Sequence, residues 1–312
     1  MSKKIKKNLK KYYFKLILTL IITHNRLSEL KNCIKAVQSQ TLKIDKLLII
    51  NNGSTDGTKK YLDDNKIPSI HCSNLGSAGG WNKGINYALE NNYKYIWMMD
   101  DDGFPNINSL ELLQSNISKD HACLSSLILD KDNKNILAIP LPILNKRLNP
   151  IIFKFKRKLK KTSDLSKLNK FYDYVNFFNG ALISIKHIKK IGNIDLNFFI
   201  YGEEVDYFHR LRKVGKVQTY INSFHFHPNI AKPWSRIKIY YYLKNSIYLN
   251  YKYYDLPLLR SLMNILVIFY RVLRYNGIVF FFQTFSYINI KEIIFAIYKG
   301  FSLQIGNDYH KK

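Results

Sequence analysis

The chain has 312 residues, of which 46% are hydrophobic, and its formal net charge is +27 at pH 7. Because this hydrophobic content is ample for a folded core, the composition excludes an intrinsically disordered chain. The charge suggests a phosphate-rich partner or an anionic lipid surface, but it accompanies a general abundance of Lys, Asn, Ile and Tyr. We therefore interpret it as a surface property and expect no nucleic-acid partner.

The cysteines and the N-terminus both favour a cytoplasmic protein. Cys33, Cys72 and Cys123 form no CxxC pair, which fits a reducing compartment and argues against a disulfide framework. The apolar stretch at residues 16–22 follows a basic arm, is too short for a signal peptide and precedes no small-residue cleavage site. No uninterrupted apolar run reaches the roughly 18 to 20 residues of a membrane-spanning helix.

Residues 15–120 predict strands that alternate with helices. Short apolar runs predict strands near 15–23, 45–52, 67–72 and 93–99, and helical spacing predicts helices near 28–41, 56–65, 85–92 and 108–117. This alternation implies right-handed βαβ crossovers and a mostly parallel sheet covered on both faces. Ligands of such sheets bind beyond the carboxyl ends of the strands, where every polar loop of this region falls.

After residue 120 the pattern changes. Residues 153–170 are a basic, weakly structured insert, residues 173–192 predict a strand and a helix, and residues 216–229 predict a late strand. From residue 236 onward the chain is helical, very apolar and aromatic. We expect an α/β domain over residues 1–235 and a helical appendage over residues 236–312.

Polar residues follow the first two predicted strands in the sequences THNR and NNGSTDGT. Together they resemble the loops of family 2 glycosyltransferases of the GT-A fold. The resemblance implies that residues 1–235 form a Rossmann-like catalytic domain for a nucleotide sugar. It assigns the base and ribose to Thr23, Asn25, Arg26, Asn51 and Asp56. Asn51 replaces the family's usual Asp and lacks its charge, and an ordinary Asx or Gly turn explains these residues equally well when they are taken alone.

The sequence NLGSAGGWNKG, residues 74–84, predicts a glycine-rich loop before a helix. Glycines let the backbone approach a ligand closely, and N–H groups at the start of the next helix favour a diphosphate. The resemblance assigns this role to Asn74, Gly76, Gly80 and Asn82; a plain tight turn is the alternative. Trp81, Phe178 and Tyr201 are candidates for stacking on sugar rings, although core packing explains them equally well.

The strand predicted at residues 93–99 ends in Asp100, Asp101 and Asp102. Adjacent like charges need an offsetting cation, and Mn²⁺ or Mg²⁺ prefers oxygen ligands and bridges carboxylates to a diphosphate. A solvated acidic turn is the alternative. The triplet resembles the galactofuranosyltransferase branch of the family. This implies that Asp102 ligates the metal, that Asp100 belongs to the ribose or metal shell, and that Asp101 lies in the nucleotide-sugar site.

The sequence YGEEVD, residues 201–206, resembles the segment that carries the family's general base. Glu204 stands where the family usually has Asp, and a carboxylate there takes the proton of the acceptor hydroxyl as the new bond forms. Glu203 and Asp206 are further candidates, but an acidic first turn that complements the helix dipole is enough to explain both.

A histidine near the end of the late strand is the third metal ligand that the resemblance implies. His225 and His227 are two residues apart, so on a strand both face the same side. The offset from Gly215 favours His227, with His225 as the alternative. Further on, Lys244 replaces the family's Arg, which keeps the charge but loses bidentate phosphate binding.

The resemblance implies an inverting, metal-dependent transfer, with UDP-galactofuranose favoured as donor by the triple Asp and dTDP-L-rhamnose as the alternative. Arg260, Arg271 and Arg274 interrupt the C-terminal apolar runs, which predicts helices in a membrane interface with their cations on anionic headgroups. Packing on the core or on another subunit is the alternative. We expect an enzyme peripheral to the cytoplasmic face of the cell membrane, with a saccharide or lipid-linked saccharide acceptor, in O-antigen or capsule synthesis.

Two interpretations of another class stay open. A basic protein that binds nucleic acid or membrane without catalysis would explain the charge, but the basic residues are dispersed and no nucleic-acid-binding motif is present. A nucleotidyltransferase shares the general fold, yet residues 23–26 stand where its glycine-rich signature belongs.

Overall fold

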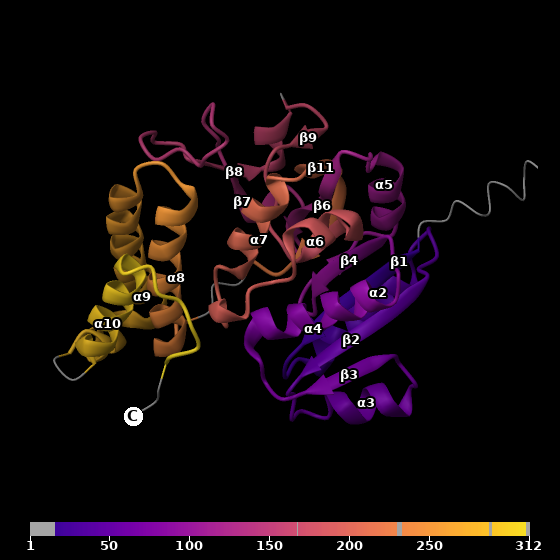
Figure 1. Ribbon diagram of the computed structural model, residues 1–312, viewed down its shortest axis with the longest axis horizontal. Helices are drawn as coiled ribbons and strands as arrows, with labels where there is room; N and C mark the ends of the chain where they lie inside the picture. The colour runs from indigo at the N-terminus through magenta and orange to yellow at the C-terminus, as the bar shows by residue number, and fades with distance from the viewer. Residues whose placement is uncertain (1–15, 167, 230–232, 287–288, 310–312) are drawn as a thin grey trace, which may run out of the picture.

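The first half of the chain folds into strands that alternate with helices, as the sequence predicts (Figure 1). The computed structural model describes residues 16–166, 168–229, 233–286 and 289–309, and the basic N-terminal arm lies outside them. The strands are β1 (Ile17–Thr23), β2 (Lys46–Asn52), β3 (Ser69–Cys72) and β4 (Tyr95–Asp100). The helices are α2 (Leu27–Gln38), α3 (Thr58–Asp64), α4 (Gly76–Glu90) and α5 (Ser109–Asn116).

The second half completes a mixed sheet. Its strands are β5 (Phe104–Pro105), β6 (His121–Asp130), β7 (Ile136–Pro142), β8 (Lys158–Lys161), β9 (Phe171–Tyr172), β10 (Asn179–Ser184) and β11 (Lys216–His227). Its helices are α6 (Ile185–Ile191) and α7 (Glu203–Arg212), with short 3₁₀ turns η1 (Thr162–Leu165) and η2 (Leu196–Phe198). The basic insert therefore contributes β8 and η1 to the fold.

The strand order is β3-β2-β1-β4-β10-β6-β11-β5, with β7 beside β6, β8 beside β7 and β9 beside β11. Neighbours from β3 to β4 are parallel, and so are β6 and β11. By contrast, β10 is antiparallel to both β4 and β6. The short strands β5 and β9 are antiparallel to β11, and β7 is antiparallel to β6 and β8. The predicted α/β fold is therefore confirmed, but its sheet is mixed, and its parallel part is limited to β1–β4 and the β6–β11 pair.

Both faces of the sheet are covered. Along β1, Leu18 and Leu20 point into one core cluster while Ile17 and Ile21 point into another, because successive side chains of a strand alternate between faces. Helices α4 and α7 pack on the first face, and α2 and α5 on the second. Burial on both faces explains why the central strands are nearly continuous apolar runs. The polar loops are left at the strand ends.

Residues 76–84 are helical, so the prediction of a glycine-rich loop there is wrong. Glycines of α4 bring the helix against the sheet. A Cβ on Gly80 would lie 3.2 Å from the Ile22 side chain, and one on Gly84 would lie 2.3 Å from that of Leu20. These two positions need glycine for close helix–sheet packing, and not for the approach of a ligand.

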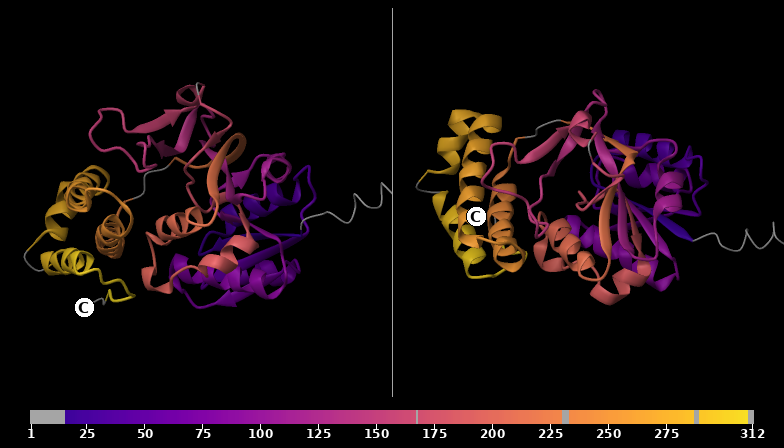
Figure 2. Two further views of the ribbon diagram at one scale, coloured as in Figure 1. Left: turned by 45° about the horizontal axis from the view of Figure 1, so that its top comes forward. Right: turned by 90° about the horizontal axis from the view of Figure 1, so that it is seen from above.

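Three helices form the C-terminal region: α8 (Arg236–Tyr253), α9 (Pro257–Thr284) and α10 (Ile290–Phe301). They lie together beside the sheet domain (Figures 1 and 2). Leu249 of α8 packs in the core of the sheet domain, whereas Tyr240 and Tyr241 belong to a separate cluster shared with α9 and α10. Among the described residues, α9 is long and apolar enough to cross a membrane by length and composition. Arginines interrupt this helix, so it contains no uninterrupted apolar run of the length that predicts a membrane span.

Candidate active site

The loops after β1 and β2 are bound to each other at the carboxyl edge of the sheet. The Asn25 side-chain oxygen accepts a hydrogen bond from the Thr55 backbone N–H (2.7 Å), and the Ser54 hydroxyl oxygen accepts one from the Asn25 N–H (3.0 Å). Asp56 accepts a hydrogen bond from the Leu27 N–H at the start of α2 (2.9 Å). These contacts hold the two predicted nucleotide-binding loops in one conformation.

Thr23 and Asn51, which end the same two strands, are buried. The Asn51 side-chain oxygen accepts a hydrogen bond from the Ser54 N–H (3.1 Å), and its amide nitrogen lies 3.1 Å from His71 Nδ1. Both polar atoms of the Asn51 side chain therefore have partners within the protein. The assignment of both residues to base and ribose stays a prediction.

Arg26 reaches across to the aspartate triplet. Its Nη1 donates hydrogen bonds to Asp101 (2.9 Å) and Asp102 (2.7 Å). Arg26 was expected to contact the nucleotide, and the cation expected beside the triplet was a metal. In the structure the guanidinium is the nearest positive charge to two of the three aspartates. Arg26, in the loop after β1, therefore offsets part of the negative charge of the aspartates, a role that the family resemblance does not imply.

The triplet is electrostatically crowded even with Arg26 present. Burial, together with the negative charges of Asp102 and Asp101, raises the pKa of Asp100 to about 8. Burial also raises the pKa of Asp101, although Arg26 opposes this shift. Arg26 therefore does not fully offset burial and repulsion among the aspartates, and a further positive charge would stabilise their charged forms.

His227 is the histidine that faces the triplet, and its role as a metal ligand stays a prediction. Its Nε2 lies 3.2 Å from Asp102 Oδ1. Burial disfavours its charged form, but the hydrogen bond and charge of Asp102 outweigh this and raise the pKa of His227. His225 is fully buried, with its ring against Gly103 and Gly180, and burial lowers its pKa to about 3.

The three acids of α7 occupy different surroundings. Glu204 is half-buried, and its carboxylate accepts a hydrogen bond from the Gly202 N–H (2.9 Å). Glu203 is buried and accepts a hydrogen bond from the Ser77 hydroxyl of α4. Burial raises the pKa values of both, and the charge of Asp100 adds to the shift of Glu203. Of the three α7 acids, Glu203 is therefore the one whose pKa is affected by the charge of the aspartate triplet.

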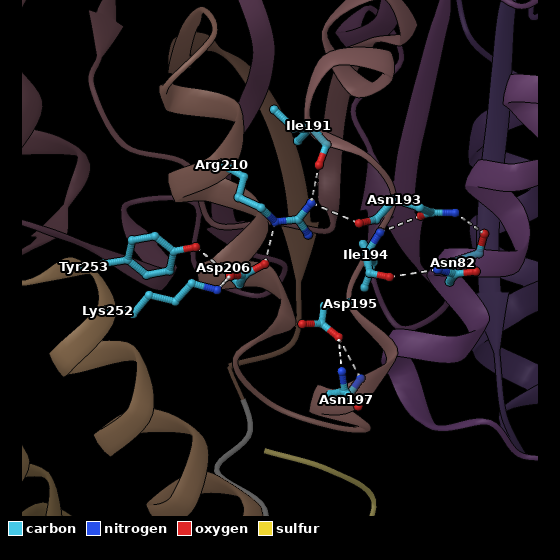
Figure 3. A network of polar contacts seen from close by, with 10 residues as sticks. All are labelled: Asn82, Ile191, Asn193, Ile194, Asp195, Asn197, Asp206, Arg210, Lys252 and Tyr253. Atoms are coloured by element: carbon cyan, nitrogen blue, oxygen red, sulfur yellow. Dashed lines mark hydrogen bonds and ion pairs between the residues drawn. The ribbon is translucent and has the colours of Figure 1, made fainter. Parts of the chain in front are cut away.

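Asp206 is part of a structural network, which Figure 3 shows. Its buried carboxylate accepts hydrogen bonds from Arg210 Nε (2.6 Å), Lys252 Nζ (2.9 Å) and the Tyr253 hydroxyl (2.6 Å). The Arg210 guanidinium continues to the Asn193 carbonyl (3.0 Å). The possible site role of Asp206 is therefore not supported, because its carboxylate is fully used to join α7 to α8.

Asn82 and Trp81 of α4 also have structural positions. The Asn82 side-chain amide donates to the Ile194 carbonyl (2.8 Å), which ties α4 to the segment before α7 (Figure 3). Trp81 is buried in the core and stacks on Phe178, with ring centroids 4.2 Å apart. The expectation that Trp81 or Phe178 stacks on a sugar is wrong, because the core encloses both rings.

Gly76 and Asn74 lie where α4 begins. Gly76 has φ +71°, and a Cβ there would lie 2.3 Å from the Phe199 carbonyl oxygen, so only glycine fits. The Asn74 side chain accepts a hydrogen bond from the Gly76 N–H (3.0 Å). These two residues border the loop that leads into α7, and their contact with a diphosphate stays a prediction.

Sequence reasoning missed Asn245 of α8. Its amide nitrogen donates to the carbonyls of Phe198, Ile200 and Tyr201, at 3.2, 3.1 and 2.7 Å. It thereby holds the loop that positions Glu203 and Glu204 at the start of α7. The only sequence signal is its place after Lys244, in the segment that resembles the family's Arg-Asn pair.

Two basic residues of the C-terminal helices form ion pairs within the protein. Lys244 is fully buried, where it donates to the Gly306 carbonyl (2.6 Å) and pairs with Asp308, so it does not reach a phosphate. Arg260 is buried and pairs with Asp255, so the expectation that it meets lipid headgroups is wrong.

This chain is similar in sequence to proteins of known family. The sequence profile described as glycosyl transferase family 2 matches residues 19–177. Galactofuranosyltransferase GlfT1 of Mycolicibacterium smegmatis is 28% identical over 218 residues, covering 68% of this chain and 70% of that protein. GlfT1 of Mycobacterium tuberculosis is 27% identical over 220 residues, with the same coverage.

Two solved structures share the fold. GalNAc-T7 with UDP, GalNAc and Mn²⁺ has a TM-score of 0.60 at 16% identity, covering 79% of this chain and 49% of that one. S. aureus TarS has a TM-score of 0.52 at 11% identity, covering 87% and 44%. This chain therefore spans about half the length of each, and at such identities the likeness shows the GT-A fold alone. Because the profile match extends over half of its residues, the chain belongs to glycosyl transferase family 2.

Proposed function

We propose that this glycosyltransferase transfers galactofuranose, with inversion, from UDP-galactofuranose to a saccharide acceptor. One observation carries the proposal: Asp102 faces His227 at the edge of the sheet, while burial and the neighbouring aspartate charges raise the pKa of Asp100 to about 8. A carboxyl group with a strongly raised pKa indicates a functional site, here one where a bound cation would stabilise the charged form of the carboxyl. The GlfT1 relatives are galactofuranosyltransferases by name, which favours this donor over dTDP-L-rhamnose.

The residues present fit a divalent cation such as Mn²⁺ or Mg²⁺. An Asp102 carboxylate oxygen and the His227 imidazole nitrogen are ligand types that suit Mn²⁺. In the structure these two atoms contact each other and Asp102 also pairs with Arg26, so a bound cation would replace the Asp102–His227 contact. Across the described ranges, no three His, Cys, Asp or Glu side chains stand close enough to hold a metal by themselves. We therefore assign the direct contacts to Asp102 and His227, with Asp100 in the surrounding shell. When bound, the cation supplies neutralising charge to the leaving diphosphate.

Glu204 is the general base of the proposed reaction. It lies at the first turn of α7, its pKa is raised by burial, and the Gly202 N–H holds one of its carboxylate oxygens. The carboxylate takes the proton from the acceptor hydroxyl while that oxygen bonds to the anomeric carbon and the nucleotide diphosphate leaves from the opposite face. Glu203 is the less suitable base, because it is buried against Ser77.

We propose a lipid-linked saccharide as the acceptor, on the cytoplasmic face of the cell membrane, in the assembly of a surface polysaccharide such as O-antigen or capsule. The support is the large number of exposed apolar side chains on α9 and α10. Such a surface is unusual for a protein whose substrates are all in free solution.

A panel of sugar nucleotides tests the donor and the metal together. We expect turnover with UDP-galactofuranose, its loss in EDTA and its recovery with Mn²⁺ or Mg²⁺. Asp102→Asn should lower turnover by at least about 100-fold and weaken Mn²⁺ binding measured by calorimetry in the presence of UDP. Asp120→Asn, an acid at the other end of the strands, is the matched control. Preference for dTDP-L-rhamnose would replace the donor, and EDTA-resistant turnover would contradict the metal.

A further inference from the structure

We propose that α9, α10 and the tip of the β7–β8 connection form one docking face that lies flat on an anionic bilayer surface. This inference rests on the proposed lipid-linked acceptor and names the part of the molecule that meets its membrane. The docking face consists of exposed apolar residues of α9 and α10 and the two phenylalanines of the tip: Leu258, Leu262, Leu266, Tyr270, Leu273, Ile278, Val279, Phe282, Ile294, Phe295, Tyr298, Phe153 and Phe155.

The exposed residues of α9 follow helical spacing. Leu258, Leu262, Leu266 and Tyr270 recur every four residues, and Leu266 is 66% exposed. Only 11% of the most apolar 18-residue window of this helix is buried. Single exposed apolar residues are ordinary, but a row of them along one side of a helix indicates an interaction site.

The opposite side of α9 is already occupied. Ile268 and Val272 are fully buried in the cluster that includes Ile239 and Tyr240 of α8. Figure 1 shows α8, α9 and α10 packed side by side, so the inward apolar side chains of the three helices are buried against one another. The outward apolar residues are therefore left exposed, because no other described part of this chain covers them.

The β7–β8 connection adds aromatic and basic side chains beside α9. Phe153 and Phe155 are 78% and 110% exposed, and they alternate with Lys154, Lys156 and Arg157. The Arg260 guanidinium of α9 donates to the Pro150 carbonyl (2.8 Å), and Asn145 donates to Asp255 just before α9 (3.2 Å). Figure 2 shows the connection extending over the helices.

Charge decides between a bilayer and a second copy of the chain. The contacts of Arg260 with Pro150 and of Asn145 with Asp255 hold the basic connection beside the apolar residues of α9. A symmetric dimer through this face would bring two basic tips onto one shared interface. Anionic headgroups instead neutralise the cations, while the phenyl rings and aliphatic side chains enter the interfacial region.

The helix lies in the interface and does not cross it. Arg271 and Arg274 are in the middle of α9, where a spanning helix would take them toward the bilayer centre at a cost of several kcal/mol. Gly277 is non-helical (φ 83°, ψ 171°), so α9 bends before its last apolar turns. Helix α8 packs along α9. Its buried Lys244 and Asn245 are polar residues that suit a helix bundle in water and not one within a bilayer.

The docking face is connected to the catalytic end of α7 by a layer of rings. Arg271 lies over the Trp234 ring (5.7 Å to the centroid), and Trp234 stacks on Tyr201 (6.0 Å between centroids). Tyr201 comes two residues before Glu203 and three before Glu204. A molecule anchored in the docked bilayer therefore approaches the proposed base from the side of α9.

Vesicle flotation of the full chain tests the inference. We expect flotation with vesicles of phosphatidylcholine mixed with phosphatidylglycerol, little with phosphatidylcholine alone, and a decrease at high salt. The triple variant Leu266→Ser/Val279→Ser/Phe282→Ser and the double variant Phe153→Ser/Phe155→Ser should each weaken binding by about tenfold or more. Ile107→Ser, an apolar residue 56% exposed on the sheet domain, is the matched control and should bind normally.

The outcomes separate this inference from the proposed function. Transfer to a soluble saccharide should be unchanged in all three variants, and its absence in a wild-type protein that still floats would overturn the proposed function alone. The docking face is refuted if the wild type does not bind anionic vesicles or if the triple variant binds as well as wild type. A dimer that the triple variant dissociates, with flotation unaltered, would assign the face to a second copy. Resistance to alkaline extraction with a protease-protected α9 would show a spanning helix.

Discussion

Replacing Asp206 separates a structural acid from a catalytic one on the same helix. Asp206 is 1% exposed and joins Arg210 and Lys252, whose side chains are 19% and 35% exposed. In Asp206→Asn both cations lose their counter-charge. Breaking a fully buried pair costs about 3–5 kcal/mol, and since both cations can partly rehydrate we expect about 2–4 kcal/mol. At about 2–4 °C per kcal/mol for a chain of this size or somewhat smaller, Tm should fall by roughly 5–15 °C.

The assay is thermal unfolding followed by circular dichroism, with Glu204→Gln as the matched control. Burial alone would raise the pKa of Asp206, but the hydrogen bonds of Tyr253 and Lys252 and the charge of Arg210 lower it. Its stabilising contribution is therefore present at neutral pH and is lost as pH falls through the lowered pKa, so the difference in Tm from wild type should shrink in acid. The reasoning is refuted if Asp206→Asn keeps the wild-type Tm and loses turnover as Glu204→Gln does.

Three further changes give distinct expected results. A Gly-to-Ala change ordinarily stabilises a helix, but Gly84→Ala should destabilise the protein by about 1–3 kcal/mol in urea unfolding, because the added Cβ would meet Leu20. The exposed Lys83→Ala is the control and should change stability by less than about 0.5 kcal/mol. The acidic limb of the kcat/KM profile should lie above the ordinary glutamate value of about 4.3, because burial raises the pKa of Glu204, and a limb at or below that value would contradict its role as base. Asn245→Ala removes the donor to three carbonyls before α7 and should lower kcat more than it lowers stability; an unchanged kcat would show that the loop holds its shape without it.

Much of the fold was predictable because its signals are local. The apolar runs of β1, β2 and β4 and the polar residues that follow them mark a strand and its carboxyl end. The family resemblance also placed Asp102 and His227 in one site, and the structure brings them to 3.2 Å of each other, while their role as metal ligands stays a prediction. Such motifs place a residue at the correct edge of the sheet without any knowledge of packing.

Contacts between distant residues were not predictable in the same way. Arg26 meets Asp101 and Asp102 across 75 and 76 residues, and no local pattern indicates where its guanidinium points. The glycines at residues 76–84 predict a ligand-binding loop, but in the structure they lie in α4, where Gly84 allows the helix to pack against Leu20. Asn245 is one polar residue within an aromatic helix, and its function depends on a loop more than 40 residues earlier.

The antiparallel strand at the centre of the sheet determines which fragments of this protein can fold. The family profile ends at residue 177, two residues before β10 begins. A fragment cut there would contain β4 and β6 without the strand that joins them, so its sheet would fall into two pieces with unpaired edges. The parallel partner of β6 arrives only with β11, which ends at His227. During synthesis the sheet therefore cannot close until some fifty residues beyond the recognisable family segment have left the ribosome, and any shortened form of the chain must extend at least that far.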